Sequence, residues 1–127
     1  MIVLGLSGAV SHDASAALYV DGKLVAAVEE ERFLRDKHAK GKMPYEAVKF
    51  CLKQAGIKPS DIDVVAFPFA EIGLKSPARW HYAKRHWYAP DRAFTALFAG
   101  NRRYWRNHKN VMKMLDDLDI GSQRVKF

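Results

Sequence analysis

The sequence has a single cysteine, Cys51, and no long apolar run. One cysteine excludes an intramolecular disulfide and a zinc-finger framework. The absence of a run of ~20 apolar residues argues against a transmembrane helix. The opening Met1–Leu6 is apolar, but it has no basic leader and is soon followed by Ser, His and Asp residues, so it does not predict a signal peptide. We therefore expect a cytoplasmic protein without a membrane partner.

Acidic residues are scarce in the central stretch 75–113, which has ten Lys or Arg residues but one acid, Asp91. Its net charge of +9 exceeds the +7 of the whole chain. Such a stretch is typical of a phosphate or nucleic-acid partner, or of helices with a solvated basic face. Aromatic residues recur there at helical spacing, which favours helices with the aromatics inward and the arginines outward over a nucleic-acid interface.

The beginning of the chain predicts a small β-meander. Short apolar runs at 2–6, 14–20 and 23–29 are typical of three strands. Asp21-Gly22 separates the last two runs, and both residues tolerate positive φ. We therefore expect a tight hairpin at this dipeptide.

A helix is expected next, beginning at Pro44 and ending at Gly56, with Cys51 on its apolar stripe. This position predicts that Cys51 belongs to the core and is not a nucleophile. A fourth strand is predicted at 62–67. Because a helix between two strands indicates a parallel crossover, the pattern predicts a mixed α/β sheet in the order β-β-β-α-β.

The whole chain, 1–127, is interpreted as an N-terminal fragment of one domain. Its core is 1–70, a basic aromatic helical insertion follows at 75–118, and a further strand begins at 122–127. The last helix of the insertion has an apolar stripe at helical spacing, formed by Tyr104, His108, Val111, Met112, Leu115 and Leu118. The apolar end, with neither a capping turn nor a polar tail, indicates a piece of a longer protein.

Several motifs in the first sixty residues occur together at a specific spacing. They are Gly5-Leu6-Ser7-Gly8, His12–Ala17, Asp21-Gly22-Lys23, Glu29–Phe33, Lys37-His38, Cys51-Leu52, Ala55–Ile57 and Asp61–Asp63. In this combination the chain resembles the start of the carbamoyltransferase family that includes nodulation carbamoyltransferases and those that tailor antibiotics. The resemblance covers roughly the first half of the chain.

This resemblance implies the first half of a ribonuclease-H-like (actin-like ATPase) domain, similar to the universal tRNA-threonylcarbamoylation protein. It also implies an ATP-dependent enzyme that converts carbamoyl phosphate to carbamoyl-adenylate and transfers the carbamoyl group to an acceptor hydroxyl. The partners would be carbamoyl phosphate, that acceptor and the remainder of its own chain. The family's iron ligands are expected beyond Phe127, because His81 and His86 have the wrong spacing. We therefore expect no metal ligand in this chain and no activity from this fragment alone.

The loop 7–15 is the first candidate site. Small residues such as Ser7 and Gly8 allow backbone N–H groups to approach an anion, and with Asp13 they are predicted to form a phosphate-side turn. The resemblance makes His12 a catalytic candidate, which as a neutral imidazole with a reference pKa of ~6.5 could accept the proton of the acceptor hydroxyl. The alternative is a turn histidine held by Asp13.

The second candidate site follows the third strand. Lys37 and His38 lie in a cation-rich loop that would attract phosphate. The resemblance implies that Lys37 contacts the ligand, and Lys37 is predicted to be a catalytic residue. His38 and Arg32 are predicted to help to bind substrate. The alternative is a solvated basic loop. The run Glu29–Glu31 ends the third strand, where neighbouring acids point to opposite faces, so that one acid is expected to face the active edge of the sheet near Arg32. The alternative is a solvated strand end with a local ion pair.

Two rival functions keep the same residues. One is a threonylcarbamoyl-transfer relative that acts on tRNA, in which the basic stretch would touch RNA. The other is a non-catalytic interaction module, in which Trp80 and Trp87 would belong to a docking surface.

Overall fold

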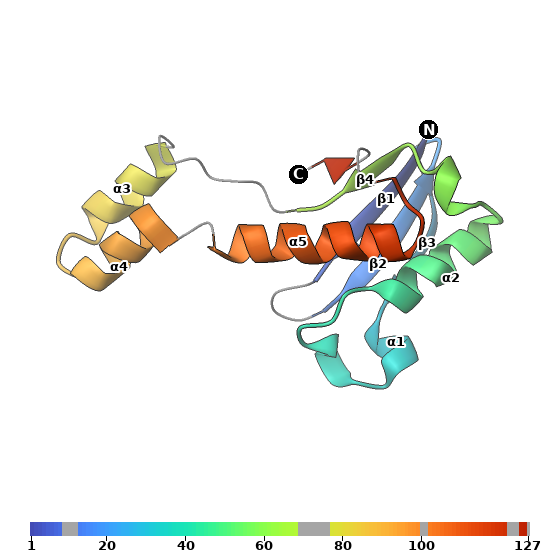
Figure 1. Ribbon diagram of the computed structural model, residues 1–127, viewed down its shortest axis with the longest axis horizontal. Helices are drawn as coiled ribbons and strands as arrows, with labels where there is room; N and C mark the ends of the chain where they lie inside the picture. Colours follow the sequence, from blue (N-terminus) through green and yellow to red (C-terminus); the bar gives the residue numbers. More distant parts are fainter. Residues whose placement is uncertain (9–12, 69–76, 100–101, 122–124, 127) are drawn as a thin grey trace.

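The described part of the chain is a β-sheet with helices packed on one face and a separate helical pair (Figure 1). The computed structural model describes residues 1–8, 13–68, 77–99, 102–121 and 125–126. Within these ranges, none of the helices combines the length and apolar character that crossing a bilayer would require.

Three strands near the N-terminus, β1 (Ile2–Ser7), β2 (Ser15–Val20) and β3 (Lys23–Glu29), form an antiparallel meander. The turn between β2 and β3 has φ values of 49° at Asp21 and 78° at Gly22. Two successive positive φ values give the turn whose twist matches that of the flanking strands. The three predicted strands and the hairpin are confirmed, with ends that differ by one residue.

The remaining strands extend the sheet on the other side of β1. The order is β3-β2-β1-β4-β5, in which β4 (Val64–Ala66) is parallel to β1 and β5 (Val125–Lys126) is parallel to β4. A meander followed by parallel strands on the far side of β1 is the arrangement of the first half of a ribonuclease-H-like domain. The predicted fold class is therefore confirmed. The fourth strand is shorter than predicted, and at its beginning Ile62 is still the C-cap of a short 3₁₀ turn, η2 (Pro59–Asp61), with its N–H bonded to the carbonyl oxygen of Pro59.

Helix α2 (Tyr45–Ala55) makes the crossover from β3 to β4. It is bounded as the sequence predicts: Pro44 is its N-cap, and Gly56 ends it with a φ of 65°. The side chain of Cys51 is fully buried, and burial raises the pKa of its thiol. Cys51 is therefore a core residue, as expected.

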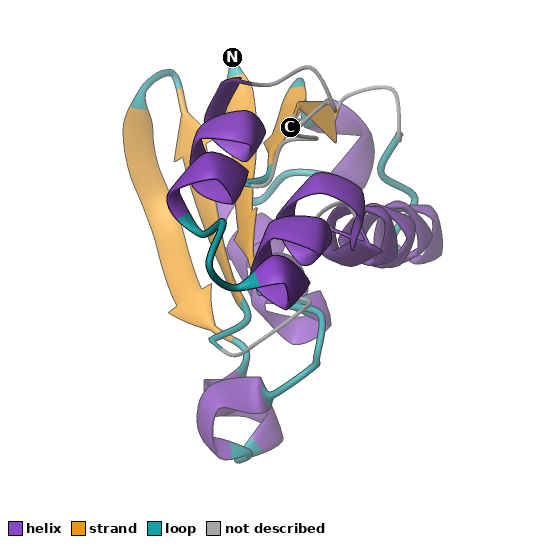
Figure 2. Cartoon of the chain, turned by 90° about the vertical axis from the view of Figure 1, so that its left-hand side faces the viewer, coloured by secondary structure: helices purple, strands orange, loops and turns teal. Residues whose placement is uncertain are grey.

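One face of the sheet is covered by α2 and α5 (Arg102–Asp117), which lie on the same side of the strands (Figures 1 and 2). Their apolar faces close the core over the strands, and its fully buried members include Leu4, Leu18, Val48, Cys51, Val65, Val111, Met114 and Leu115. The predicted stripe of α5 is right at Val111 and Leu115, whereas Met112 is half-buried and Met114 takes the buried position. A helix packed across a sheet buries the face nearest the strands, and this face is turned slightly from the predicted one.

A polar contact joins the two covering helices at one end. The hydroxyl of Tyr45 donates to a carboxylate oxygen of Asp117 over 2.7 Å. Desolvation by burial, together with this hydrogen bond, raises the pKa of Tyr45 to about 12. The bond ties the beginning of α2 to the end of α5.

The helical insertion differs from its prediction in which side chains it buries. Helix α3 (Pro77–Arg85) and helix α4 (Pro90–Phe94), which continues into the π-helical turn η3 (Thr95–Ala99), pack on one another away from the sheet (Figure 1). Trp87 is 79% exposed, whereas Arg79 is 7% exposed. The prediction that the aromatics face inward is therefore wrong for this pair, and the prediction that the arginines face outward is right for Arg85 and Arg92 but wrong for Arg79.

The aromatic side chains are exposed because the pair formed by α3 and α4 is small. Two short helices bury too little surface to cover large rings, so Trp80, Tyr88 and Phe94 also stay exposed. The guanidinium of Arg79 instead lies between the helices and donates to the carbonyl oxygen of Leu97 over 2.9 Å. A buried charged head needs such an acceptor.

Gly8, at the end of β1, is a position where only glycine fits. Its φ is 104°, and a Cβ there would lie 2.5 Å from the Cα of Ala14. We expect Gly8→Ala to lower the free energy of unfolding by about 1–3 kcal/mol more than Gly41→Ala, because overpacking adds to the φ penalty. Gly41 is the matched control: its φ is 68° and nothing lies within 4 Å of its would-be Cβ. Equal losses in urea denaturation would contradict the steric explanation.

Candidate functional site

The two candidate segments meet at one edge of the sheet. Because β1 and β3 are both antiparallel to β2, the ends of β1 and β3 lie at the same edge. Ser7 pairs with Ser15, which in turn pairs with Glu29, so these three residues form one cross-strand row. The topology therefore brings the loop after β1 close to the segment after β3.

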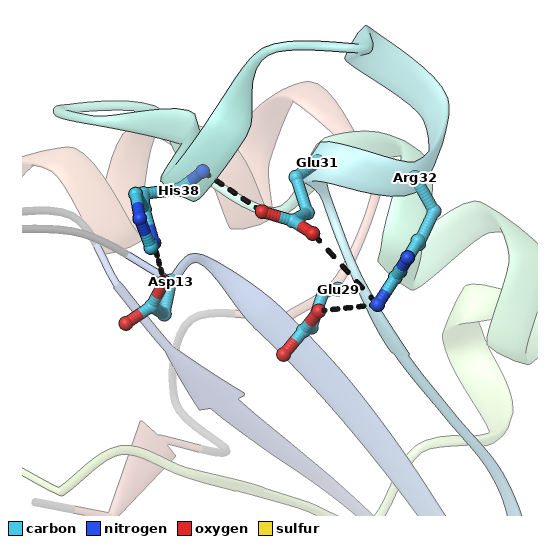
Figure 3. Close-up of polar contacts among 5 residues, drawn as sticks. All are labelled: Asp13, Glu29, Glu31, Arg32 and His38. Carbon is cyan, nitrogen blue, oxygen red and sulfur yellow. Dashed lines mark hydrogen bonds and ion pairs between the residues drawn. The ribbon is translucent and has the colours of Figure 1, made fainter.

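Asp13 and His38 join these two segments directly (Figure 3). The backbone N–H of Asp13 donates to the carbonyl oxygen of His38 over 2.7 Å. The Nδ1 atom of His38 lies 2.9 Å from a carboxylate oxygen of Asp13. Asp13 thus contacts His38, and His12, its partner in the alternative prediction, lies outside the described residues.

Glu31 holds the same turn from the other side. It begins helix α1 (Glu31–Leu34), a single turn that replaces the predicted end of the strand. Its carboxylate accepts the backbone N–H of His38 over 2.8 Å (Figure 3). His38 is the middle residue of the 3₁₀ turn η1 (Lys37–Ala39). The loop that carries Lys37 is therefore fixed at its second residue.

Arg32 lies between two of the acids. Its Nη2 atom is 3.4 Å from Glu29 and 3.8 Å from Glu31 (Figure 3). The local ion pair that was one interpretation of this run is present. Because the Arg32 side chain is largely exposed, the pair contributes at most about 1 kcal/mol to stability.

Glu30 contradicts the interpretation of a solvated strand end. It is 2% exposed, and its carboxylate accepts the backbone N–H groups of Glu46 over 3.1 Å and of Ala47 over 2.7 Å. These N–H groups belong to the first turn of α2, which has no partner for them within the helix. Glu30 therefore caps α2 from a distant segment, a role that the sequence analysis missed.

A groove of about 960 Å³ lies on the face of the sheet opposite α2 and α5. Its floor is a cross-strand row of small residues, Gly5, Ala17, Ala27 and Ala66. Its polar end is lined by Ser7, Ser15, Glu29 and Arg32. Two of the predicted substrate-binding residues, Ser7 and Arg32, therefore line one groove.

The other predicted site residues lie beside this groove. Gly8 is buried against Ala14, and Asp13 and His38 form the contact described above. Lys37 is exposed and directly precedes His38 in η1. In the ranges that the structure covers, no group of three or more His, Cys, Asp or Glu side chains could hold a metal ion.

Asn107 is a second residue that the sequence analysis missed. It is fully buried on α5, and its amide nitrogen and oxygen have no hydrogen-bond partner among the described residues. Buried amides are nearly always hydrogen-bonded in native proteins, so this side chain is unusual. The sequence gives no signal for it beyond a polar residue four positions before Val111, on the buried face of α5.

Residues 2–123 match the family described as Carbamoyltransferase N-terminus. The nodulation protein NolNO of Sinorhizobium fredii (strain NBRC 101917 / NGR234) is 42% identical over 81 residues, which cover 53% of this chain and 12% of that protein. The uncharacterized protein sll1178 of Synechocystis sp. (strain ATCC 27184 / PCC 6803 / Kazusa) is 46% identical over 65 residues, 51% of this chain and 10% of that protein.

A third relative, an uncharacterized 19.2 kDa protein in the syrM 5′ region of Rhizobium etli, is 38% identical over 81 residues, 53% of this chain and 47% of that protein. The chain thus matches less than half the length of each of these relatives. The solved structure of YeaZ from Pseudomonas aeruginosa aligns with a TM-score of 0.45 at 16% identity, over 94% of this chain and 40% of that one. The family match spans nearly the whole sequence, and the chain therefore belongs to the carbamoyltransferase family, as its N-terminal part.

Proposed function

We propose that this chain forms one wall of an ATP-dependent carbamoyl-transfer site. In the proposed reaction the carbamoyl group passes from carbamoyl phosphate, through carbamoyl-adenylate, to an acceptor hydroxyl. The observation that supports this site most is the contact between Asp13 and His38. This chain belongs to the carbamoyltransferase family, and in it the contact holds together the loop next to His12 and the turn that contains Lys37.

Each predicted residue has a role in this proposal. The turn of Ser7, Gly8 and Asp13 would hold a phosphate, and Asp13 would fix this turn through the hydrogen bond from its backbone N–H to the carbonyl oxygen of His38. Lys37 would offset the negative charge that develops during transfer, and His12 would accept the proton of the acceptor hydroxyl. Arg32 and His38 would contribute to substrate binding from the second segment. The carboxylates of Glu29 and Glu31 lie 3.4 and 3.8 Å from Nη2 of Arg32 and would offset part of its attraction for an anionic substrate.

ATP and iron enter the proposal as ligands of the complete protein. The proposed iron ligands lie beyond Phe127, in the remainder of the protein. The proposed steps of this chain are to bind phosphate at the β1–β2 loop and to place Lys37 and His12. The remainder of the protein would close the nucleotide site, and we expect residues 1–127 alone to show no turnover.

A second candidate function, a non-catalytic docking surface, is favoured by a different observation. Trp80 and Trp87 are 60% and 79% exposed on a helical pair that lies away from the sheet. Several exposed aromatic side chains on one small helical pair are typical of interaction surfaces. This surface is compatible with carbamoyl transfer, and it becomes the main function only if the site binds no ligand.

Calorimetric titration of ATP and of carbamoyl phosphate into the complete protein that carries these residues tests the proposal. We expect both ligands to bind, and His12→Ala or Lys37→Ala to weaken carbamoyl phosphate binding at least about tenfold, which corresponds to ~1.4 kcal/mol. If the folded protein binds neither ligand, the proposed enzymatic function is wrong and the docking surface is the better account.

A further inference from the structure

The turn that contains Lys37 and His38 has an unfavourable backbone conformation. His38 has a φ of 66° and Ala39 a φ of 39°, and Asp13, which faces them, has a φ of 59°. Residues other than glycine adopt positive φ only where the surrounding structure holds them there. Such residues gather at ligand-binding and catalytic sites more often than elsewhere. The surrounding structure must therefore hold this turn.

Three hydrogen bonds hold His38, two from Asp13 in the loop after β1 and one from Glu31 in its own segment. Asp13 provides two of them, one from its backbone N–H at 2.7 Å and one to the imidazole Nδ1 at 2.9 Å. Glu31 provides the third, by accepting the backbone N–H of His38 at 2.8 Å. The backbone N–H, the carbonyl oxygen and the ring of His38 are therefore all fixed.

The contact with Asp13 also sets the state of the imidazole. An ionised carboxylate can only accept a hydrogen bond, so Nδ1 of His38 carries the hydrogen in this contact. Nε2 is then the ring nitrogen that can accept a proton. The ring is held in one orientation, as is typical of a histidine that must present a defined atom to a ligand.

Glu31 is itself held in place. Its side chain is 23% exposed, and its other carboxylate oxygen lies 3.8 Å from Nη2 of Arg32. Its neighbour Glu30 is buried and fixed by two N–H groups of α2. Two neighbouring acids therefore have different roles: Glu30 anchors the segment to α2, and Glu31 reaches the turn that contains His38.

We propose that Glu31 is a positioning residue for carbamoyl transfer, which fixes the backbone of His38 and thereby places Lys37 beside the β1–β2 loop. This inference rests on the proposed function. Without the Glu31 carboxylate, the N–H of His38 loses its acceptor, and the turn can relax from its positive φ values. Lys37, the preceding residue, then moves relative to the loop next to His12. A misplacement of about 1 Å in such a site can lower the rate ~10²-fold.

Four variants of the complete protein separate this role from others. Glu31→Ala removes the acceptor, and Glu31→Asp keeps the charge but is one methylene too short to reach the His38 N–H. Glu31→Gln keeps an acceptor oxygen at the same length and removes the charge. Asp36→Ala is the matched control, because Asp36 is an exposed acid of the same segment whose side chain has no hydrogen bond among the described residues.

We expect Glu31→Ala and Glu31→Asp to lower kcat/KM for carbamoyl transfer by roughly 10- to 100-fold. Glu31→Gln and Asp36→Ala should stay close to the wild type, and the thermal midpoints of Glu31→Asp and Glu31→Gln should agree. The inference is overturned if Glu31→Ala behaves like Asp36→Ala, or if Glu31→Gln loses as much activity as Glu31→Asp. If Glu31→Ala fails to fold, the Asp and Gln variants still decide. A wild-type protein without transfer activity would instead overturn the proposed function.

Discussion

Replacing Glu30 by alanine is expected to lower the free energy of unfolding of residues 1–127 by about 2–4 kcal/mol. Glu30 is 2% exposed and accepts the N–H groups of Glu46 and Ala47. Helix α2 has Pro44 at its N-cap position, and a proline side chain cannot accept a hydrogen bond. The variant therefore leaves two donors without a partner, the buried N–H of Ala47 and the half-buried N–H of Glu46. It also removes a negative charge from the N-terminus of α2, where the helix dipole favours one.

The size of this effect can be separated from a general loss of negative charge. Glu29→Ala is the matched control, because Glu29 is the preceding acid, is exposed and contacts Arg32 at 3.4 Å. We expect this control to cost less than about 1 kcal/mol. Urea denaturation followed by circular dichroism gives the free energies, and hydrogen exchange at the amides of Glu46 and Ala47 reports the cap locally. Equal losses for the two variants, with unchanged exchange, would refute the capping role.

The sheet and its crossover helix could be predicted because their signals are local. The hairpin depends on Asp21-Gly22, two residues that accept positive φ, and α2 lies between Pro44 and Gly56. The apolar pattern of a strand and the residues that begin and end a helix are signals that span only a few positions. A sequence read in order therefore contains them completely.

The role of Glu30 could not be predicted in the same way, because it depends on a contact across sixteen residues. Three neighbouring acids after a strand give no sign of which one turns inward. One signal was available: a helix that begins after Pro44 needs an acceptor from elsewhere for its first N–H groups. The prediction that aromatic side chains face inward failed at Trp80 and Trp87 for a related reason. Helical spacing identifies a face of a helix, but it does not show whether another element covers that face.

The candidate site was predictable in its place but not in its contacts. A meander of three strands puts the ends of the first and third strands at one edge, so the meeting of the loop after β1 with the segment after β3 follows from topology. The contact between Asp13 and His38 does not, because it requires positive φ at both residues. Neither residue is glycine, so the sequence shows no sign of this conformation.

Replacing Lys37 by alanine is expected to have the largest effect on carbamoyl transfer among the cations of its loop, a loss of about 10²–10³-fold in kcat/KM. The reason is position rather than charge. Lys37 immediately precedes His38, whose backbone and ring are fixed by Asp13 and Glu31. Its side chain therefore extends from a backbone held by the next residue, and a charge that is placed in advance stabilises a transition state at a lower cost of reorganisation.

Lys40→Ala provides the control for this prediction, since Lys40 is an exposed cation that follows η1 by one residue and lies outside the proposed site. Both variants remove one positive charge from the same loop, so any general attraction of the loop for anions falls equally in both. Transfer kinetics at two salt concentrations separate the two effects, because screening weakens the general attraction. A loss for Lys40→Ala as large as that for Lys37→Ala would mean that the loop acts as a diffuse basic surface. In that case the fixed turn at His38 would have no part in placing the charge.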